Sequence, residues 1–382
     1  MTLHIFNPEH DIALASGIEN FTPPRAGRLL RHDLGFLPAL WAQPGDTVLA
    51  DDPALADALL RQLQEEAGRV LGIRVNGPED VRLVSAKEVR AMAGGRLSLS
   101  PQTGVDGVEP WGWDAALRSS LRRIGVADSL LPGDEQLRQV RRLSHRSTAA
   151  RLMDALAQET HLDDGVVGEV PAECTSIGEV EAFIAGHGRA VLKAPWSSSG
   201  RGVRFCGATD APLRQLEPWL RGVLNRQGSV MAEPYYDKVR DFGMEFLAGA
   251  DGTVAYCGLS LFHTDCGAYK GNIVATEAAK REMMEQYLPL SLVDKVRTLL
   301  CRHLQVILQG QYQGPLGVDM MVCVGGSPAH DCPLLLHPCV EINLRRTMGH
   351  AALALTPSRD DIRGVMHIDC SGGTYGIQLF QS

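Results

Sequence analysis

The chain has 382 residues, enough for two or three domains, and its apolar content of 45% is ordinary for a globular protein. A formal net charge of −8 without a long basic run argues against a nucleic-acid surface, and no apolar run reaches the length of a membrane span. The N-terminal sequence MTLHIFNPEHD lacks the features of a signal peptide, and the nine cysteines are scattered without C-x-x-C spacing. We therefore expect a cytoplasmic protein with reduced thiols, no nucleic-acid partner and no membrane contact.

The first part of the chain, residues 1–143, is predicted to form an α/β domain. Apolar runs at Leu3–Phe6, Thr47–Ala50 and Gly72–Val75 predict strands, and a helix is expected from about 53 to 68. Strands that alternate with helices favour a parallel sheet, which binds ligands beyond the carboxyl ends of its strands.

A polar segment, NPEHD, follows the first of these strands. Because it lies at the edge where such sheets bind ligands, it supplies candidates for substrate contact: Asn7, Glu9, His10 and Asp11. The alternative is that Asn7 and Asp11 cap a turn and a helix.

A helix is predicted to begin after Leu143, with Ser144 or Ser147 as its N-cap. Arg146 then lies at the helix N-terminus, where backbone N–H groups attract anions. A cation at this end does not favour the helix dipole, so a bound phosphate would account for the arginine. The alternative is an arginine exposed to solvent.

A strand lysine precedes a loop rich in serine and glycine. Ala190–Ala194 is a predicted strand that carries Lys193, Val203–Phe205 is a second strand, and Ser197–Gly202 joins them. The backbone amides of this loop can close over phosphates, and Lys193 adds a point charge. The segment is not a Walker loop, because G-x-x-x-x-G-K-[ST] is missing and no helix follows directly.

Further along, Ser229–Ala232 predicts a strand that leads into EPYY, and Asp241 opens the next strand. The glycines and polar residues of Ser260–Ala275 predict a loop over the site. Lys270 could there neutralise a transferred phosphate, and three neighbours could contact substrate: His263, Tyr269 and Asn272. The alternative is a solvated surface loop. Apolar residues at helical spacing predict a core helix from about 292 to 308.

Two strands near the C-terminus place oxygen atoms on one face. Leu334–Leu336 begins a strand that continues through Val340 and Ile342, and alternation turns the last two toward the core. Glu341 and Asn343 then share the opposite face. Both can reach one hard cation, and Mg²⁺ prefers such oxygen ligands.

The neighbouring strand supplies a third oxygen ligand. Asp319 interrupts the otherwise apolar strand Gly314–Val324, where an unpaired carboxylate would be costly. A cation shared with Glu341 and Asn343 would be its partner. The alternatives are an Asp319 that accepts backbone hydrogen bonds and a solvated strand edge that carries the other two residues by chance. A separate cluster, Cys323, Cys332, His337 and Cys339, matches no zinc spacing, and buried thiols explain it better.

Taken in order, these motifs resemble those of the ATP-grasp superfamily. The order is a basic residue before a helix, a strand lysine with a Ser/Gly loop, a glutamate at a hinge, an acidic residue, and then D…E-x-N. In this sequence these are Arg146, Lys193 with SSSGRGV, Glu233 in EPYY, Asp241, Asp319 and Glu341-Ile342-Asn343. The resemblance covers about residues 144–355. It implies a mixed α/β and α+β protein, with a pre-grasp-like parallel α/β domain followed by a two-subdomain ATP-grasp fold.

The resemblance also implies roles for individual residues. ATP phosphates would be bound by Arg146 and Lys193, beneath a lid formed by Ser198, Ser199, Gly200 and Gly202. Adenine would meet Glu233, Tyr235 and Tyr236, and the ribose would meet Asp241. Mg²⁺, for which Mn²⁺ could substitute, would be held by Asp319, Glu341 and Asn343. The implied subdomains are residues 144–232 (small, lid) and 233–355 (large, metal site), followed by a tail, residues 356–382, that predicts a hairpin.

Two features depart from the family pattern. Lysine often stands where this chain has Arg146, and arginine keeps the charge while adding a planar fork. The stretch from Asp319 to Glu341 is longer than usual because it contains GGSPAHDCP. The NPEHD motif points to no subfamily.

The implied reaction is ATP-dependent ligation of small molecules. A substrate carboxylate would attack the γ-phosphate to give an acylphosphate and ADP, and an amine or thiol would then displace phosphate. Arg345 and Lys270 would stabilise the developing charge, and Arg346 could contact substrate. No serine or cysteine nucleophile motif is present. The alternatives are an ATP-grasp kinase for a small molecule and a nucleotide-binding module without catalysis. The sequence does not indicate an oligomeric state.

Overall fold

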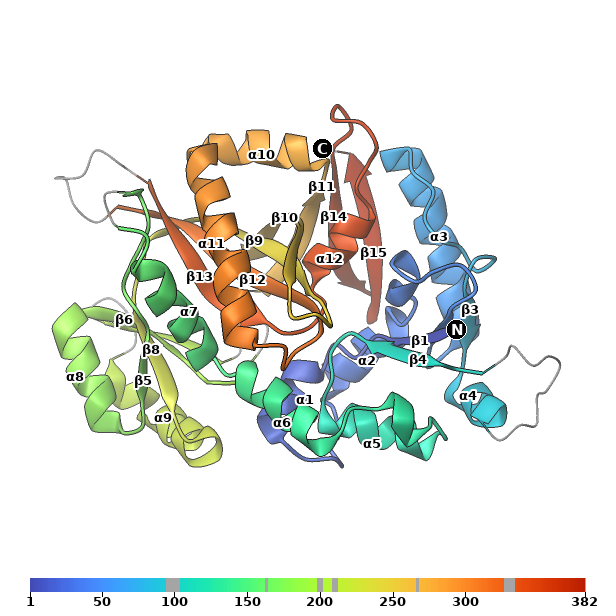
Figure 1. Cartoon of the computed structure of the whole chain (residues 1–382), viewed down its shortest axis with the longest axis horizontal. Coiled ribbons are helices and arrows are strands. Elements are labelled where there is room, and N and C mark those ends of the chain that lie inside the picture. Colours follow the sequence, from blue (N-terminus) through green and yellow to red (C-terminus); the bar gives the residue numbers. More distant parts are fainter. Residues whose placement is uncertain are drawn as a thin grey trace.

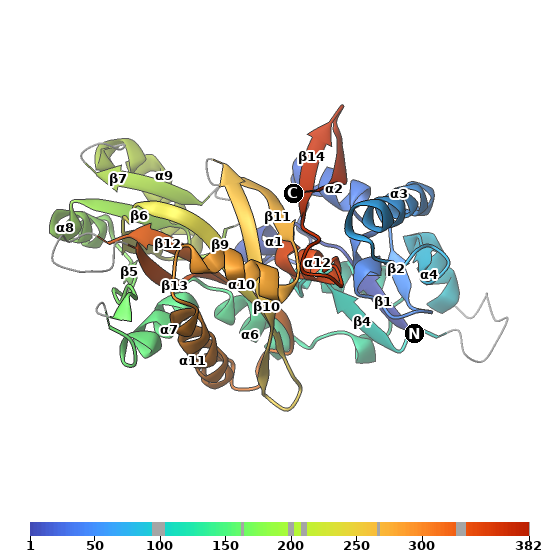
Figure 2. The ribbon, with the colours of Figure 1, turned by 90° about the horizontal axis from the view of Figure 1, so that it is seen from above.

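The computed structural model of the chain describes residues 1–93, 104–161, 164–197, 202–207, 212–265, 268–325 and 334–381. These residues form one parallel and two antiparallel sheets, arranged side by side with helices packed around them (Figures 1 and 2). The predicted mixed fold class is therefore confirmed.

The parallel sheet lies in the N-terminal part, with strand order β3-β2-β1-β4. Its elements are β1 (Thr2–Ile5), α1 (His10–Ser16), α2 (Arg25–Asp33), the 3₁₀ turn η1 (Leu37–Leu40), β2 (Thr47–Leu49), α3 (Pro53–Leu71), β3 (Arg82–Val84), α4 (Ala86–Ala93), β4 (Gly107–Pro110), α5 (Ala115–Arg123), the 3₁₀ turn η2 (Asp128–Leu130) and α6 (Asp134–Leu143). The strand predicted at Gly72–Val75 is wrong. Gly72 ends α3 in the left-handed conformation, and the third strand forms later, at β3.

The small antiparallel sheet has the order β5-β8-β6-β7, and helices pack against it (Figure 1). Its elements are β5 (Ala172–Cys174), α8 (Ile177–His187), β6 (Arg189–Lys193), β7 (Val203–Gly207), α9 (Leu213–Gln227) and β8 (Val230–Pro234). Alternation along β6 turns Ala190 and Leu192 toward α8 and α9, where they join one core cluster. Lys193 therefore faces away from these helices.

The large antiparallel sheet has the order β13-β12-β9-β10-β11-β14-β15. Its elements are α7 (Ser147–Ala157), β9 (Lys238–Ala248), β10 (Val254–Asp265), β11 (Ala268–Val274), α10 (Glu277–Glu285), α11 (Leu290–Leu308), β12 (Gly314–Val324), β13 (Leu334–Asn343), α12 (Met348–Ala354), β14 (Gly364–Ser371) and β15 (Thr374–Gln381). The loop predicted at Ser260–Ala275 is wrong, because β10 and β11 pair there as strands. Half-buried strands tolerate the polar residues and glycines that we interpreted as a loop.

The apolar cores do not stop at the predicted domain boundaries. Val140 and Leu143 of α6 and Leu152 of α7 share one cluster with the large sheet and α11. Phe6 after β1 shares a second cluster with Met366 of β14. The division into residues 1–143, 144–232, 233–355 and 356–382 therefore separates elements that pack together. No helix in the described ranges is both long and apolar enough to cross a membrane.

Candidate active site

Three neighbouring strands of the large sheet place their polar residues in rows on one face, which we call the site face. Strand register gives a first row of Asp241, Met321 and His337, a second of Gly243, Asp319 and Glu341, and a third of Glu245, Gly317 and Asn343. The intervening residues of β9 and β12 are apolar and belong to the core on the opposite face. Period-two alternation thus produces both the core and the rows.

One register shift interrupts this pattern on β13. Asp319 pairs with Glu341, but Met321 pairs with His337, so β13 contains extra residues between these two pairs. The prediction that Val340 faces the core is wrong for this reason. Val340 is half-buried, and Cys339 joins the core cluster instead.

The predicted metal ligands lie together in the second and third rows. Asn343 Nδ2 donates to Asp319 Oδ2 at 3.0 Å, and Asp319 is directly opposite Glu341 in the register. Burial, together with the Glu341 and Glu245 carboxylates, raises the pKa of Asp319 to about 7. Carboxylates this close repel one another unless a cation or a proton lies between them.

Arg146 reaches this group from the start of α7. Its Nη2 donates to Glu341 Oε1 at 2.7 Å, and its Nη1 donates to the Ala194 carbonyl oxygen at 2.6 Å and to Ser197 Oγ at 2.7 Å. Among the described residues its buried Nε has no hydrogen-bond partner. The predicted serine cap is wrong: Arg146 itself occupies the N-cap position, and no side chain caps the helix.

Lys193 connects the small sheet to the site face. It is only 6% exposed, forms an ion pair with Glu233 of β8, and lies 3.4 Å from the Val340 carbonyl oxygen of β13. Lys193 and Glu233 therefore lie where the two antiparallel sheets meet.

The N-terminal segment meets the site through an arginine. Arg345 Nη2 donates to Asp11 Oδ2 at 2.8 Å and to Asn343 Oδ1 at 3.0 Å. Burial alone would raise the pKa of Asp11, but the Arg345 guanidinium, together with His10 and Arg146, outweighs this effect and holds that pKa below its usual range. Arg346 Nη2 lies 3.3 Å from Glu109 Oε2, and its guanidinium lies over the ring of Trp41.

Two other residues of NPEHD are held inside the N-terminal part. Asn7 donates to the Gly112 carbonyl oxygen and to Asp114, while His10 Nδ1 lies 3.4 Å from Asp114 Oδ2. Both are at most 2% exposed. The structure does not bring Asn7 or His10 to the metal-ligand group.

Glu9 is paired with an arginine of α2. Its Oε1 accepts from Arg31 Nη1 at 2.7 Å, and burial, opposed by Arg31, raises its pKa. Its Oε2 is buried without a hydrogen-bond partner among the described residues.

The remaining predicted residues are distributed around the junction of the two antiparallel sheets. Tyr235 and Tyr236 lie between β8 and β9, and Asp241 is paired with Lys238 at 2.5 Å. Lys270 is exposed on β11, where Asn272 is buried and donates to Ser260 Oγ at 2.8 Å. Gly202 directly precedes β7. The predicted lid residues Ser198, Ser199 and Gly200 lie outside the described residues.

The sequence interpretation missed Glu245 and its partner His350. Glu245 is 3% exposed, and its Oε2 lies 3.0 Å from His350 Nδ1 on α12. A Cβ added to Gly349 would lie 1.9 Å from Glu245 Oε1, so the helix packs directly on this carboxylate. Alternation in DFGMEF could have revealed it, because Asp241, Gly243 and Glu245 share one face of β9.

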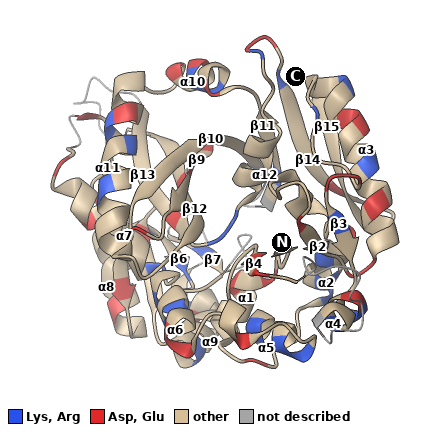
Figure 3. Cartoon of the chain, turned by 45° about the vertical axis from the view of Figure 1, so that its right-hand side comes forward, with Lys and Arg blue, Asp and Glu red and all other residues tan. Residues whose placement is uncertain are grey.

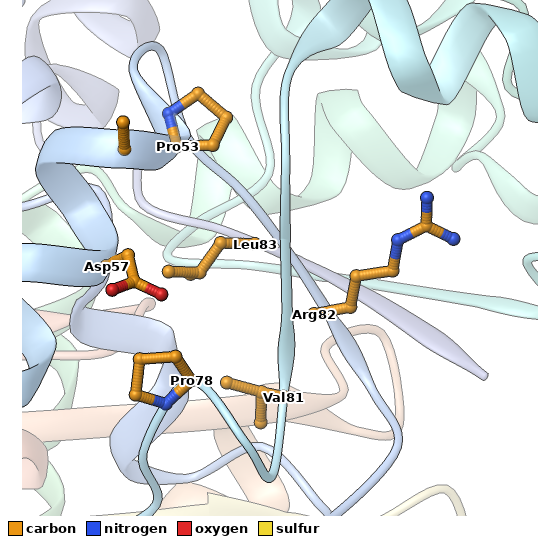
Figure 4. Close-up of a pocket in the computed structure, with 7 residues that line it drawn as sticks. Pro53, Asp57, Pro78, Val81, Arg82 and Leu83 are labelled. Carbon is orange, nitrogen blue, oxygen red and sulfur yellow. The ribbon is translucent and has the colours of Figure 1, made fainter.

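On the site face, β9 and β12 carry acidic residues, whose positions are red in Figure 3. A small gap of about 10 Å³ lies there, with walls that include Asp11, Ser197, Glu341 and Asn343. It has room for about one water molecule or ion. A larger hollow of about 520 Å³ lies elsewhere, beside α3 and β3, with Asp57 and Leu83 in its wall (Figure 4). It lacks convergent polar groups, so we assign it no site.

The side-chain oxygens of Asp319, Glu341 and Asn343 are too few to hold Mg²⁺ by themselves, so other oxygen ligands would have to complete the site. In the described ranges no three His, Cys, Asp or Glu side chains gather into a metal-binding group. The predicted ligands are two carboxylates and one amide oxygen. Mg²⁺ is usually held by one or two carboxylates plus substrate phosphates. The residues fit that pattern.

No protein-family model and no curated protein sequence matches the chain. Solved structures similar to it include N5-carboxyaminoimidazole synthetase from Staphylococcus aureus complexed with ADP, with 11% identity, a TM-score of 0.44, and coverage of 86% of this chain and 83% of that one. Another is the biotin carboxylase domain of 2-oxoglutarate carboxylase from Hydrogenobacter thermophilus, with 11% identity, a TM-score of 0.49 and coverage of 86% and 75%. A third is biotin carboxylase from Campylobacter jejuni, with 14% identity, a TM-score of 0.48 and coverage of 87% and 78%.

Because these likenesses are weak, the assignment of the fold rests on the topology of the chain itself. A small antiparallel sheet carries Lys193 against a larger one that carries Asp319, Glu341 and Asn343, after a parallel α/β unit. This is the arrangement that the ordered motifs predict. The chain therefore has a mixed α/β fold built from these three sheets, and no family is assigned.

Proposed function

We propose that the protein is an ATP- and Mg²⁺-dependent ligase that joins a small-molecule carboxylate to an amine. The observation that supports this best is the convergence of Asp319, Glu341 and Asn343 with Arg146 and Lys193 at the junction of two sheets. This group combines oxygen ligands for a cation with two basic side chains, and it comes from distant parts of the chain. Such a combination suits a nucleoside triphosphate.

In this proposal the phosphates of ATP lie between Lys193 and Arg146. The Nε of Arg146, which has no hydrogen-bond partner among the described residues, is a donor available to a phosphate oxygen. Glu233, Tyr235 and Tyr236 line the adenine end and Asp241 the ribose end, and the lid comprises Ser198, Ser199, Gly200 and Gly202. Asp319, Glu341 and Asn343 hold Mg²⁺, which would neutralise the phosphate charge when bound.

The proposed acyl transfer depends on cationic side chains that lie next to the proposed metal ligands. A substrate carboxylate oxygen attacks the γ-phosphorus, the bond to the β-phosphate oxygen breaks, and an acylphosphate and ADP form. An amine then attacks the acyl carbon, inorganic phosphate leaves, and the amine loses a proton. Arg345, oriented by Asp11 and Asn343, stabilises the charge on the acyl group. Lys270 and Arg346 complete the proposed catalytic and substrate-binding set, which on the N-terminal side includes Glu9 and Asp11.

The test is ADP release with ATP and Mg²⁺ against a panel of amino acids, other small carboxylates and amines. Wild type is compared with Glu341→Ala and with the matched control Glu282→Ala, whose side chain is 69% exposed on α10. We expect ADP only when a carboxylate and an amine are both present, and we expect Glu341→Ala to abolish its release.

Other outcomes would contradict the ligase. ADP release with a hydroxyl compound alone would identify a kinase. Saturable ATP binding without release for any acceptor in the panel would favour the non-catalytic nucleotide-binding module. Equal rates in Glu341→Ala and wild type would show that this carboxylate holds no essential cation.

A further inference from the structure

The carboxylate of Asp11 takes up much of the hydrogen-bonding capacity of Arg345. Arg345 Nε donates to Asp11 Oδ1 at 3.0 Å, and Nη2 donates to Asp11 Oδ2 at 2.8 Å. Nη2 also donates to Asn343 Oδ1, and Nη1 donates to the Arg346 carbonyl oxygen, both at 3.0 Å. These contacts use four of the five guanidinium N–H groups. A second carboxylate therefore cannot bind Arg345 with two hydrogen bonds while Asp11 stays in place.

The contact between Asp11 and Arg345 lies at the edge of the proposed site and is open to solvent. Asp11 is two hydrogen bonds away from Asn343, through Arg345. It also borders the gap of about 10 Å³ described above, together with Ser197 and Glu341. The side chains of Asp11 and Arg345 are 19% and 16% exposed, so a small molecule can reach both.

The proposed ligation requires a proton acceptor near this gap. An amine is an ammonium ion at neutral pH, and its nitrogen must lose a proton before it can attack. The described residues that border the gap carry two carboxylates, Asp11 and Glu341. Glu341 is paired with Arg146 and is a proposed ligand of Mg²⁺. Asp11 is then the carboxylate at the gap that remains to accept a proton.

The proton affinity of Asp11 depends on its contact with Arg345. Burial raises the pKa of Asp11, whereas the Arg345 guanidinium lowers it. His10 and Arg146 lower it further, so this pKa lies below its usual range. Glu341, which borders the same gap, adds a negative charge that acts in the same direction as burial. A substrate carboxylate that replaces Asp11 on Arg345 would remove the strongest opposing charge, and the pKa of Asp11 would rise.

We propose that Asp11 accepts the proton of the incoming amine, after the substrate carboxylate has replaced it on Arg345. The inference rests on the proposed ligase and gives it a base. An N–H bond of the ammonium ion breaks, its proton moves to a carboxylate oxygen of Asp11, and the nitrogen keeps the electron pair. The nitrogen attacks the acyl carbon, the bond from this carbon to the phosphate oxygen breaks, and the extra proton on nitrogen goes to the departing phosphate. Asp11 then releases its proton to water and pairs with Arg345 again.

The test uses Asp11→Asn, which keeps an acceptor oxygen for Arg345 but cannot take a proton from an ammonium ion. ADP release at pH 7 is measured with the most active carboxylate and amine of the panel, and again with hydroxylamine replacing that amine. Hydroxylamine is mostly uncharged at pH 7 and needs no base. We expect Asp11→Asn to lower the rate with the amine on the order of 100-fold and to leave the rate with hydroxylamine nearly unchanged. The KM for the carboxylate should fall, because an amide on Arg345 is easier to replace than a carboxylate.

The pH profile and two further variants separate this role from a structural one. The deficit of Asp11→Asn should shrink as the pH rises to 9, since more of the amine is then neutral. Asp11→Glu keeps a carboxylate and should retain more activity with the amine than Asp11→Asn does. The matched control is Asp361→Asn, since Arg359 donates to Asp361 through the same two atoms, Nε and Nη2, at the surface.

Three outcomes would contradict these expectations. Equal losses with the amine and with hydroxylamine would show that Asp11 only positions Arg345, and they overturn the inference. Equal activities of Asp11→Glu and Asp11→Asn with the amine overturn it as well. Both results leave the proposed ligase intact. Absence of ADP release by wild type with every pair in the panel overturns the proposed function itself.

Discussion

Two regions bury polar side chains, and they do so in different ways. At the carboxyl edge of the parallel sheet, Asn7 bonds Gly112 and Asp114, and Asp114 Oδ1 also accepts from the Leu117 N–H of α5. On the site face, Asp319 faces Glu341 across one ladder pair, and His337 Nδ1 lacks a partner among the described residues. The first network satisfies its members internally, whereas the second leaves charge and hydrogen-bonding capacity for something else.

The comparison separates residues that build the fold from residues that act. NPEHD attracted attention because it lies where parallel sheets bind ligands. Its Asn7 and His10 contact Asp114 within the N-terminal part. Asp11 instead accepts a hydrogen bond from Arg345, beside the metal-ligand group. A polar motif at a strand end can therefore serve both purposes within five residues, and hydrogen-bond satisfaction distinguishes them.

The sharpest test of the site face is Asp319→Asn. We expect Mg²⁺-dependent ADP release to fall on the order of 100-fold or more, because the proposed metal site loses a charged ligand. The melting temperature at pH 8 should rise, because the amide removes a carboxylate that repels Glu341. Both are measured against Asp251→Asn, an exposed turn residue. A variant that keeps activity and loses stability would make Asp319 structural.

At the carboxyl edge of the parallel sheet, Asp114→Ala should lower the stability of the protein, whereas Asp319→Asn should raise it. We expect a loss of about 2–4 kcal/mol in the free energy of unfolding, since an N-cap is removed and two buried donors are left unpaired. The control Asp52→Ala removes the cap of α3 without a buried network and should cost about 1 kcal/mol. Denaturant titration measures both. Equal losses would contradict the distinction between the two regions.

The ion pair between Asp11 and Arg345 joins the two regions. A double-mutant cycle measures the coupling free energy of this pair. Asp11→Ala and Arg345→Ala should couple by about 1–2 kcal/mol in stability, because each leaves the other charge partly buried without its partner. The exposed pair Arg359–Asp361 supplies the control cycle and should show no measurable coupling. Additive losses at Asp11 and Arg345 would show that the N-terminal part does not depend on this contact.

The last expected effect is the pH dependence that Asp319 contributes to stability. Its pKa is about 7 in the folded protein and about 4 when unfolded, so the folded state binds the proton more tightly. This contribution to stability is complete below about pH 4 and is lost as the pH rises through 7. Without Mg²⁺, the melting temperature of wild type should fall relative to that of Asp319→Asn between pH 6 and 8. Saturating Mg²⁺ and ATP should reduce this difference in melting temperature. Parallel pH profiles of the two proteins without Mg²⁺ would contradict the prediction.

Much of the fold could be predicted from local patterns. The apolar periodicity of 292–308 corresponds to α11, and alternation in Gly314–Val324 placed Asp319 opposite the core. Predictions failed where pairing decided the outcome. Ser260–Ala275 has the composition of a loop but is held as strands by its neighbours, and Val340 was misplaced because the register shift on β13 depends on its partner strand.

The sequence by itself determined which residues are candidates for the chemistry and in what order they occur, because side-chain charge, alternation and the ordered motifs are local properties. Only the tertiary structure decided which of them meet. Arg146 and Glu341 are 195 positions apart and Arg345 and Asp11 are 334 apart, yet each pair is in hydrogen-bond contact. Burial and strand register also decided that Asn7 is satisfied and that His337 Nδ1 has no partner within the described ranges, since the cost of a polar group depends on its neighbours in space.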